Sequence, residues 1–269
     1  MEPLEITDLI AVAPVRRDDA ATRLRASGQE RAARLVEALP AVDGVLDADH
    51  CRRVLLRIHA ELQRLGEELQ VPRRVADEIR LITPRHTVRR IVDVGCGTGY
   101  ILRGLARSGA LPGVELVATD FNADLVDRGR TLARLDDCAV RFEVADALDL
   151  ATDGVPTVVI STGFLHHLDR AQVREFLARH ETPTIVGFLH YDPEPGWLTN
   201  LGSWVFHRSR MREPISRHDG NLSMRRAHPT DFLLGAATAA APSFDVSCRG
   251  GQSLHGVWRP LIGVRGADG

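Results

Sequence analysis

Apolar positions in the first part of the chain follow a helical pattern. They recur about every 3.6 residues, with arginine and glutamate between them, at Val54, Leu55, Ile58, Leu62, Leu65 and Leu69. Asp18 and Asp19 can cap an earlier helix that runs to about residue 39, where Pro40 ends it, and Pro72 can begin a further short helix. We therefore predict about three or four helices over residues 1–87, which serve as an N-terminal cap or as a dimerisation element.

From residue 88 the pattern changes to short apolar runs separated by amphipathic stretches. The runs interpreted as strands are residues 91–94, 115–119, 140–144, 157–160, 183–190, 244–248 and 258–264. Helix-like stretches follow Tyr100 and Thr230, and Asp169 with Gln172 forms a capping box for a helix to about residue 180. Strands alternating with helices predict an α/β fold with a doubly wound, Rossmann-like sheet of seven strands over residues 88–269.

The alternation stops after the fifth strand, where residues 191–227 form a long insertion. A structureless stretch of that size is usually functional in a compact domain. Tyr191, Trp197, Trp204 and Phe206 concentrate aromatic rings there, in a chain that is only 5% aromatic. Such rings suit a flat or apolar organic ligand. Packing of the insertion onto the sheet explains each ring, taken singly, about as well.

Arginine and histidine dominate the rest of the insertion. The arginines are Arg208, Arg210, Arg212, Arg217, Arg225 and Arg226. A solvated face is the commoner explanation of such a run. The alternative is a carboxylate or phosphate on the substrate, because arginine forks match these groups bidentately. His207 lies in the same stretch and is a further candidate contact.

The loop after the first strand is the most informative segment, because Gly95, Gly97 and Gly99 occupy every second position. Glycine is needed where the backbone turns sharply and approaches a ligand closely. Asp120 ends the next strand about 20 residues later, the spacing at which a carboxylate meets a ribose diol. Asp93 suits a ligand that carries an ammonium group and suits a pyrophosphate poorly. Together they indicate an adenosine-containing cofactor at the carboxyl ends of a parallel sheet.

Residues 93–99 have the form D-x-G-x-G-x-G and resemble the first motif of the class I S-adenosylmethionine (SAM) methyltransferases. The resemblance is specific over about residues 88–190. It implies an enzyme that uses SAM, yields S-adenosylhomocysteine and holds the cofactor with this loop, including Cys96. A nucleophilic role for Cys96 is disfavoured, since no neighbouring base is evident. In this family an insertion after the fifth strand commonly roofs the acceptor pocket, so residues 191–227 are expected to form a lid.

The resemblance also assigns roles to residues at the other strand ends. Asp120, followed by Phe121, would bond both ribose hydroxyls. Asp146 would accept a hydrogen bond from the adenine amine, while the backbone N–H of Ala147 reaches a ring nitrogen. Thr162 belongs to the segment after the fourth strand, which lies beside the methionine part of SAM and the acceptor atom.

Methyl transfer to a hydroxyl or ammonium also requires the loss of a proton, which a histidine can accept. His167 is the first candidate base and His166 the second, because related small-molecule methyltransferases use a histidine that matches the second of this pair. Either ring can equally bond the following helix or loop in a purely structural role. The expected acceptor is a small organic molecule of specialised metabolism, with contacts to Tyr191, Trp197, Trp204 and His207.

Two alternatives remain open, a methyltransferase of protein or RNA and a SAM-binding protein that transfers no methyl group. Residues 161–164 lack the Pro-Pro-aromatic motif of enzymes that methylate exocyclic amines of bases. No aspartate ends the fourth strand before Asp169, so we expect no metal. The target atom (O, N, C or S) stays undetermined.

Composition limits the class of protein further. All 34 basic residues are arginine, which excludes Schiff-base lysines and a Walker-type lysine. The net charge of −2 gives no general attraction to nucleic acid. The four cysteines show no paired spacing, and the acidic N-terminus has no apolar core. We expect a cytoplasmic enzyme without membrane segments, with a homodimer as one option.

Overall fold

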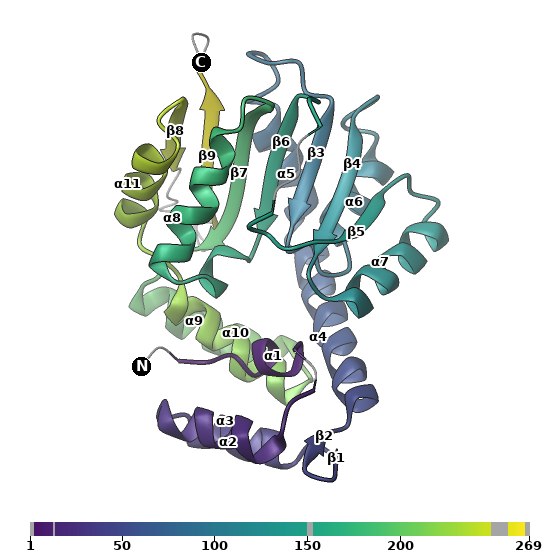
Figure 1. Cartoon of the computed structure of the whole chain (residues 1–269), viewed down its shortest axis with the longest axis vertical. Coiled ribbons are helices and arrows are strands. Elements are labelled where there is room, and N and C mark those ends of the chain that lie inside the picture. Colours follow the sequence, from purple (N-terminus) through teal and green to yellow (C-terminus); the bar gives the residue numbers. More distant parts are fainter. Residues whose placement is uncertain (1–2, 13, 150–152, 249–257, 267–269) are drawn as a thin grey trace. The chain divides into compact units, whose positions relative to one another are not determined.

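The computed structural model of the chain describes residues 3–12, 14–149, 153–248 and 258–266; the side chain of Leu198 is not described either. Its contacts divide the chain into two units. The helical unit comprises residues 1–65 and 195–226, and the sheet unit comprises residues 66–194 and 227–269. Each unit joins segments that are far apart in the sequence, and Figure 1 shows the elements of both.

The core of the helical unit is formed by both of its segments, residues 1–65 and 195–226. Its elements are α1 (Ile6–Ile10), α2 (Arg17–Ala26), α3 (Glu30–Glu37), the short strands β1 (Ala41–Val42) and β2 (Val45–Leu46), most of α4 (Ala48–Glu68), α9 (Trp197–Arg210) and α10 (Pro214–Arg226). Ile215 of α10 joins the buried cluster formed by the N-terminal helices. Asp219 accepts hydrogen bonds from the backbone N–H of Ile6 (3.1 Å) and Thr7 (2.8 Å). These bonds satisfy amides at the first turn of α1, which has no side-chain cap of its own.

The sheet unit contains seven strands in the order β5-β4-β3-β6-β7-β9-β8. They are β3 (Arg90–Val94), β4 (Glu115–Asp120), β5 (Arg141–Val144), β6 (Thr157–Thr162), β7 (Ile185–Pro193), β8 (Phe244–Cys248) and β9 (Trp258–Arg265). The first five are parallel, whereas β9 pairs antiparallel with β7 and β8. This is the predicted α/β, doubly wound, Rossmann-like arrangement, and all seven predicted strands are present.

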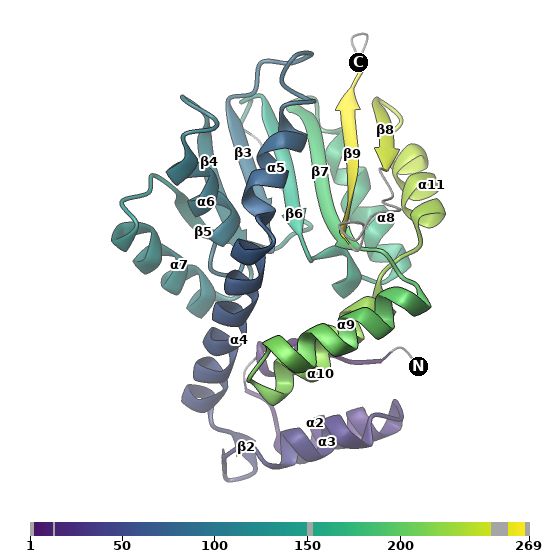
Figure 2. The ribbon, with the colours of Figure 1, turned by 180° about the vertical axis from the view of Figure 1, so that it is seen from behind.

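Helices cover both faces of this sheet. One buried cluster joins the strands to α5 (Val71–Ile79), α6 (Tyr100–Ser108) and α7 (Ala123–Leu135). The other joins them to α8 (Arg170–Ala178) and α11 (Thr230–Ala240). Figures 1 and 2 show α8 and α11 on the face opposite to α5 and α6. The predicted capping box of α8 is confirmed, with Asp169 accepting from the N–H of Gln172 and Gln172 bonding back to Asp169.

Two expectations for the helical segments differ from the structure. The single helix expected from about residue 18 to 39 is two helices, because Gly28 adopts a left-handed conformation (φ 75°) between α2 and α3. The stretch 191–227 was expected to lack regular structure. Its first residues instead extend β7 to Pro193, and α9 and α10 occupy most of the remainder.

The contact boundary in the N-terminal part of the chain lies between residues 65 and 66. Residues 66–87 belong to the sheet unit, because Val75, Ile79 and Ile82 are buried in its core. Ile82 packs so closely over Gly187 of β7 that a Cβ there would lie 2.6 Å from its side chain. Apolar burial therefore ties this segment to the sheet.

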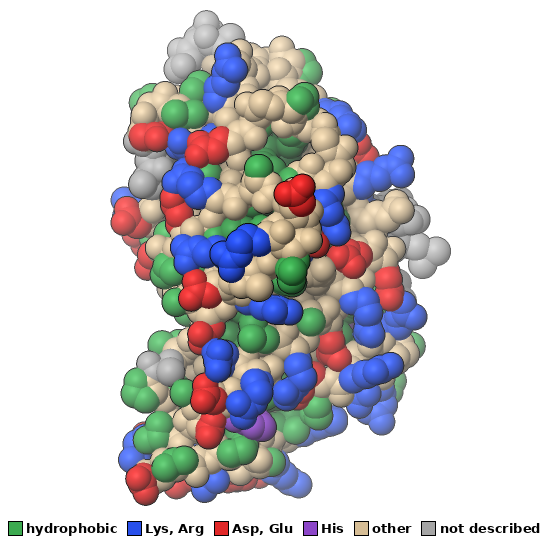
Figure 3. Space-filling model, turned by 90° about the vertical axis from the view of Figure 1, so that its right-hand side faces the viewer, with side chains coloured by type: hydrophobic (Ala, Val, Ile, Leu, Met, Phe, Trp, Pro, Cys, Tyr) green, Lys and Arg blue, Asp and Glu red, His purple; other side chains and the backbone are tan. Residues whose placement is uncertain are grey.

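Among the described helices, none combines the length and apolar character needed to cross a membrane. All four cysteines are described and none forms a disulfide. On the face shown in Figure 3, arginine side chains lie interspersed with carboxylates.

Candidate functional site

The glycine loop occupies the turn between β3 and α6. Gly95, Gly97 and Gly99 adopt φ values of 66°, 56° and 69°, a region that L residues with side chains rarely adopt. Space is also limited, because a Cβ at Gly95 would lie 2.7 Å from the ring of Phe164 and one at Gly99 would lie 2.5 Å from the ring of Phe142. Both conformation and packing therefore require glycine, and the loop presents bare backbone at the carboxyl end of β3.

Asp120 links this loop to the neighbouring strand. It is the last residue of β4, and its Oδ2 accepts a hydrogen bond from the N–H of Gly97 at 2.8 Å. Its Oδ1 accepts from the N–H of Asn122 at 2.9 Å. Burial raises the pKa of Asp120, while these two N–H groups and the charge of His167 oppose the rise. Because a carboxylate oxygen accepts more than one hydrogen bond, both oxygens can still receive hydroxyl donors.

Asp93 is a buried carboxyl group with an unsatisfied atom. Its side chain is 1% exposed, and its Oδ2 has no hydrogen-bond partner among the residues that the structure describes. Burial, together with the negative charge of Asp120, raises the pKa of Asp93 to about 8. A buried carboxylate without a partner is unstable as an anion, and a nearby cation would stabilise it. The position therefore fits a ligand that carries an ammonium group.

The strand order places these groups at the switch point of the sheet. From β3 the chain continues outward to β4 and β5, and β6 then pairs on the other side of β3. In open α/β sheets, ligands bind outside the carboxyl ends of the strands at such a point. Thr162 ends β6, and its buried Oγ1 likewise has no partner within the described part of the chain.

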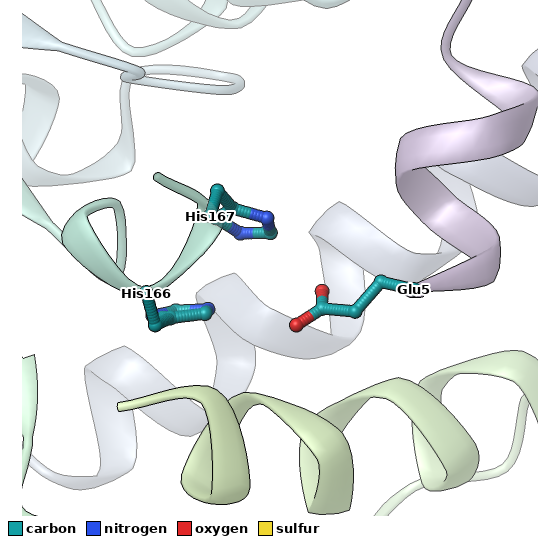
Figure 4. A group of neighbouring side chains, drawn as sticks. All are labelled: Glu5, His166 and His167. Atoms are coloured by element: carbon teal, nitrogen blue, oxygen red, sulfur yellow. The ribbon is translucent and has the colours of Figure 1, made fainter. Parts of the chain in front are cut away.

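The two histidines lie on the short 3-10 helix η1 (Leu165–His167) after β6, and Figure 4 shows their side chains. The ring centroids are 4.3 Å apart. His166 is 5% exposed, and its Nδ1 lies 2.8 Å from Oδ1 of Asp192. Oδ2 of Asp192 accepts from the backbone N–H groups of Phe164 (3.0 Å) and Leu165 (2.7 Å). His167 is half-buried and interacts electrostatically with the carboxylate at the end of β4.

Asp192 was not identified from the sequence. It lies in β7, 26 positions after His166, inside a segment that was interpreted as the start of an insertion. Its side chain is buried and holds both the η1 backbone and one imidazole ring. An acidic residue near the end of a strand beside β6 was the only available signal, and many carboxylates give that signal.

The predicted adenine contacts lie at the ends of β4 and β5. Phe121 is 60% exposed, directly after Asp120. Asp146 is exposed, and its Oδ1 accepts the N–H of Leu148 at 2.9 Å, while Ala147 is half-buried. Cys96 is buried, which raises the pKa of its thiol well above the usual value. A neutral thiol is a poor nucleophile.

The predicted substrate contacts belong to different units. Tyr191 is 6% exposed in the sheet core, with its ring stacked on Trp258 at a centroid distance of 6.5 Å. Trp197 and Trp204 lie on α9 of the helical unit and are 74% and 50% exposed. His207, also on α9, is buried with its Nδ1 2.8 Å from Oγ of Ser203.

Comparisons with known proteins agree with this geometry. Residues 91–182 match the family model described as a methyltransferase domain. Over 100 residues the chain is 33% identical to the demethylmenaquinone methyltransferase of Deinococcus radiodurans. That match covers 36% of this chain and 41% of the relative, so the chain spans less than half the length of this curated relative. Residues 91–182 of the sheet unit are therefore similar to a methyltransferase domain, and this similarity supports the class I, SAM-dependent type.

Solved structures show the same fold at low sequence identity. The magnesium protoporphyrin IX methyltransferase of Synechocystis, with bound S-adenosylhomocysteine, has a TM-score of 0.52 at 15% identity, covering 94% of this chain and 100% of that one. The plantazolicin methyltransferase, in complex with a pentazolic desmethylPZN analogue and S-adenosylhomocysteine, has a TM-score of 0.55 at 10% identity, covering 80% of this chain and 97% of that one.

Proposed function

We propose that this chain transfers a methyl group from SAM to a small organic acceptor. The observation that carries the proposal is the buried, unpartnered Oδ2 of Asp93 beside a glycine loop that is tied to Asp120. This combination fits a cationic amino-acid tail joined to a nucleoside. The match of residues 91–182 to a methyltransferase domain supports the same cofactor.

Each of these residues binds a different chemical group of the cofactor. The carboxylate of Asp93 binds the ammonium group, and Asp120 accepts hydrogen bonds from the ribose hydroxyls. Phe121, Asp146 and the N–H of Ala147 contact the adenine ring. The backbone of Gly95 to Gly99, Cys96 included, lies against the cofactor, and Thr162 faces its methionine end. The cofactor supplies an activated methyl group, so the protein has to align the acceptor and exclude water.

A histidine after β6 removes the proton from the acceptor. His167 remains the first candidate, and its electrostatic interaction with Asp120 supports a position close to the cofactor. His166 is the second candidate, supported by the hydrogen bond that orients its ring on Asp192. An imidazole is suited to this step because its ordinary pKa lies near neutrality.

The acceptor class is inferred from the neighbours and from the aromatic residues of the chain. The similar methyltransferases named above act on a porphyrin, a quinone precursor and a natural product, which favours a small molecule over protein or RNA. Tyr191, Trp197, Trp204 and His207 are the proposed acceptor contacts, with residues 191–227 as the lid. A role in specialised metabolism, a cytoplasmic location and catalysis without a metal belong to the same proposal.

The proposal also covers the roles of the two domains and the assembly. Residues 1–87 act as a cap or as a dimerisation element of the methyltransferase domain of residues 88–269, and a homodimer is the corresponding assembly. The apolar core that the N-terminal helices share with α10 supports a folded element over a loose extension.

Calorimetry with SAM tests the cofactor assignment directly. Wild type should bind SAM, and Asp120→Ala should weaken binding by about tenfold or more, because a charge-assisted hydrogen bond contributes about 1.5–3 kcal/mol. Asp124→Ala, which removes an exposed carboxylate in the first turn of α7, is the matched control and should bind as wild type does. Absence of binding, or equal binding by Asp120→Ala, would overturn the assignment.

Transfer with methyl-labelled SAM then separates the classes of acceptor. Wild type is incubated with small-molecule, protein and RNA fractions of a cell extract, and label is expected in the small-molecule fraction. Label confined to protein or RNA contradicts the acceptor class, and no transfer despite SAM binding indicates a non-methylating protein. Once an acceptor is known, an unchanged rate of His167→Ala across pH 6–9 would exclude His167 as the base.

A further inference from the structure

A basic cavity of about 210 Å³ lies within the helical unit. Its lining residues come from helices α3, α9 and α10, which Figure 2 labels. Its lining includes Arg31 of α3, Trp204 and Arg208 of α9, and Arg217, His218 and Arg225 of α10. No aspartate or glutamate is among its lining residues. The sequence groups three of these arginines in one run, and the fold adds Arg31 from a segment far away in the chain.

Helical spacing explains why these side chains share one surface. Trp204 and Arg208 are four residues apart on α9, and the guanidinium of Arg208 lies over the Trp204 ring, 5.9 Å from its centroid. Arg217 and Arg225 are eight residues apart on α10, which brings them to the same side of the helix. Nε of Arg217 donates to the carbonyl of Met211 at 2.7 Å, which holds that side chain in place.

The charges of this cavity are not compensated within the described part of the chain. None of Arg31, Arg208, Arg217 and Arg225 forms an ion pair with a described residue. The contrast with the next residue is clear, because Arg226 pairs with Asp8 at 2.8 Å. Four neighbouring guanidinium groups without a carboxylate repel one another, and an anion among them would remove that repulsion.

The nearest acidic residue on α10 is already engaged. Asp219 accepts hydrogen bonds from the N–H groups of Ile6 and Thr7 and from the hydroxyl of Thr7 at 2.8 Å. It also lies 2.7 Å from Nδ1 of His218, which orients that imidazole ring. Asp219 therefore fixes the position of the N-terminal segment and of the His218 ring, which lines the cavity. Asp219 itself does not line the cavity.

We propose that this cavity is a binding site for a small organic anion that carries carboxylate or phosphate groups. The proposal does not rest on SAM binding or on methyl transfer, although Trp204 is also one of the proposed acceptor contacts. Guanidinium forks bind both kinds of oxyanion bidentately, and the half-exposed Trp204 offers a flat apolar surface beside them. The volume of about 210 Å³ is many times the minimum that one water molecule needs, so it accommodates a compact anionic group.

Calorimetric titration with pyrophosphate and with citrate tests the site. The titrations are done at low salt and without SAM, and sodium chloride of equal ionic strength is the blank. Wild type should bind at least one of them saturably at one site per chain, and the stronger of the two identifies the phosphate or the carboxylate as the preferred group. Arg208→Gln/Arg225→Gln should weaken binding by about tenfold or more. Arg208 and Arg225 are exposed, as are the two arginines of the control variant described below. Both double variants should therefore keep the fold, and circular dichroism checks this.

The matched control is Arg23→Gln/Arg53→Gln, which removes two exposed arginines of the same unit that do not line the cavity. It should bind within about twofold of wild type. Equal weakening by both double variants, or no saturable binding of either anion by wild type, overturns the proposal. Tighter binding of a single-stranded RNA oligonucleotide, with the same dependence on Arg208 and Arg225, would also overturn it, by assigning the surface to nucleic acid.

Discussion

A buried chain of three side chains should make the sheet unit sensitive to mild acid. Nδ1 of His180 lies 2.9 Å from the carbonyl oxygen of Phe176, which can only accept, so this nitrogen carries the proton. Nε2 of His180 therefore accepts from Nε2 of His190 at 3.2 Å, and Nδ1 of His190 accepts from the hydroxyl of Ser161 at 2.9 Å. His180, His190 and Ser161 are at most 1% exposed. Both imidazole rings are thus neutral in the folded protein.

The pKa shifts give the direction and size of the effect. Burial lowers the pKa of His180 to about 4 and that of His190 well below its usual value. Between about pH 6.5 and pH 4 the unfolded chain therefore binds more protons, so the free energy of unfolding falls as the pH falls. His180 alone should remove about 2 kcal/mol between pH 7 and pH 5, and His190 acts in the same direction.

Urea unfolding at pH 5, 6, 7 and 8 measures this loss. Trp197→Phe and Trp204→Phe leave Trp258 as a fluorescence reporter in the sheet unit. Replacing His180 and His190 by glutamine in that background should reduce the stability loss from pH 7 to pH 5 by about 2 kcal/mol or more. Other titrating groups cancel in the difference between wild type and variant.

The control for this comparison is His50→Gln, which removes a half-buried histidine of α4 outside the buried chain and should not reproduce the effect of the His180/His190 variant. An identical pH dependence in wild type and in the His180/His190 variant would refute the reasoning, because it would mean that the two buried rings bind protons as readily in the folded as in the unfolded protein.

Three further predictions concern the cofactor loop and the helix caps. SAM binding at pH 7 should release close to one proton, because Asp93 has a pKa of about 8 in the free protein and must ionise to bind the ammonium group. Calorimetry in buffers of different ionisation enthalpy measures this release, and equal release by Asp93→Asn would contradict it. Gly99→Ala should lower the free energy of unfolding by about 1–3 kcal/mol through its clash with Phe142. Gly109→Ala, at a similar φ but in open space, should cost less, and a reversed order in denaturant titrations would contradict the packing argument. Asp169→Ala should cost about 1 kcal/mol by removing the cap of α8, whereas Asp169→Ser should retain most of it; equal loss in both would show that the cap contributes little.

The parts of the fold that could be predicted have local causes. The seven strands are short apolar runs between turn residues, and the capping box of α8 depends on two residues three positions apart. The glycine loop was recognisable because its requirement for positive φ is a property of single residues. Asp120 was predicted from its spacing to the glycine loop and from the family resemblance, and the structure joins its carboxylate to Gly97.

The parts that could not be predicted depend on contacts between distant segments. Asp192 caps the η1 turn from another strand, and Asp219 holds the backbone at Ile6, more than 200 positions away. Along helices α9 and α10, the apolar residues follow the helical repeat only weakly. Their packing with the N-terminal helices, around Ile215, therefore became visible only in three dimensions. Arg31 joined the arginines of α9 and α10 for the same reason.

A crystal structure of the chain with S-adenosylhomocysteine tests the central claim most directly. The account predicts both ribose hydroxyls about 3 Å from the carboxylate oxygens of Asp120 and the ammonium group on the side of Asp93. Adenosine density away from the ends of β3 and β4, or an ammonium group that makes no contact with Asp93, would contradict it.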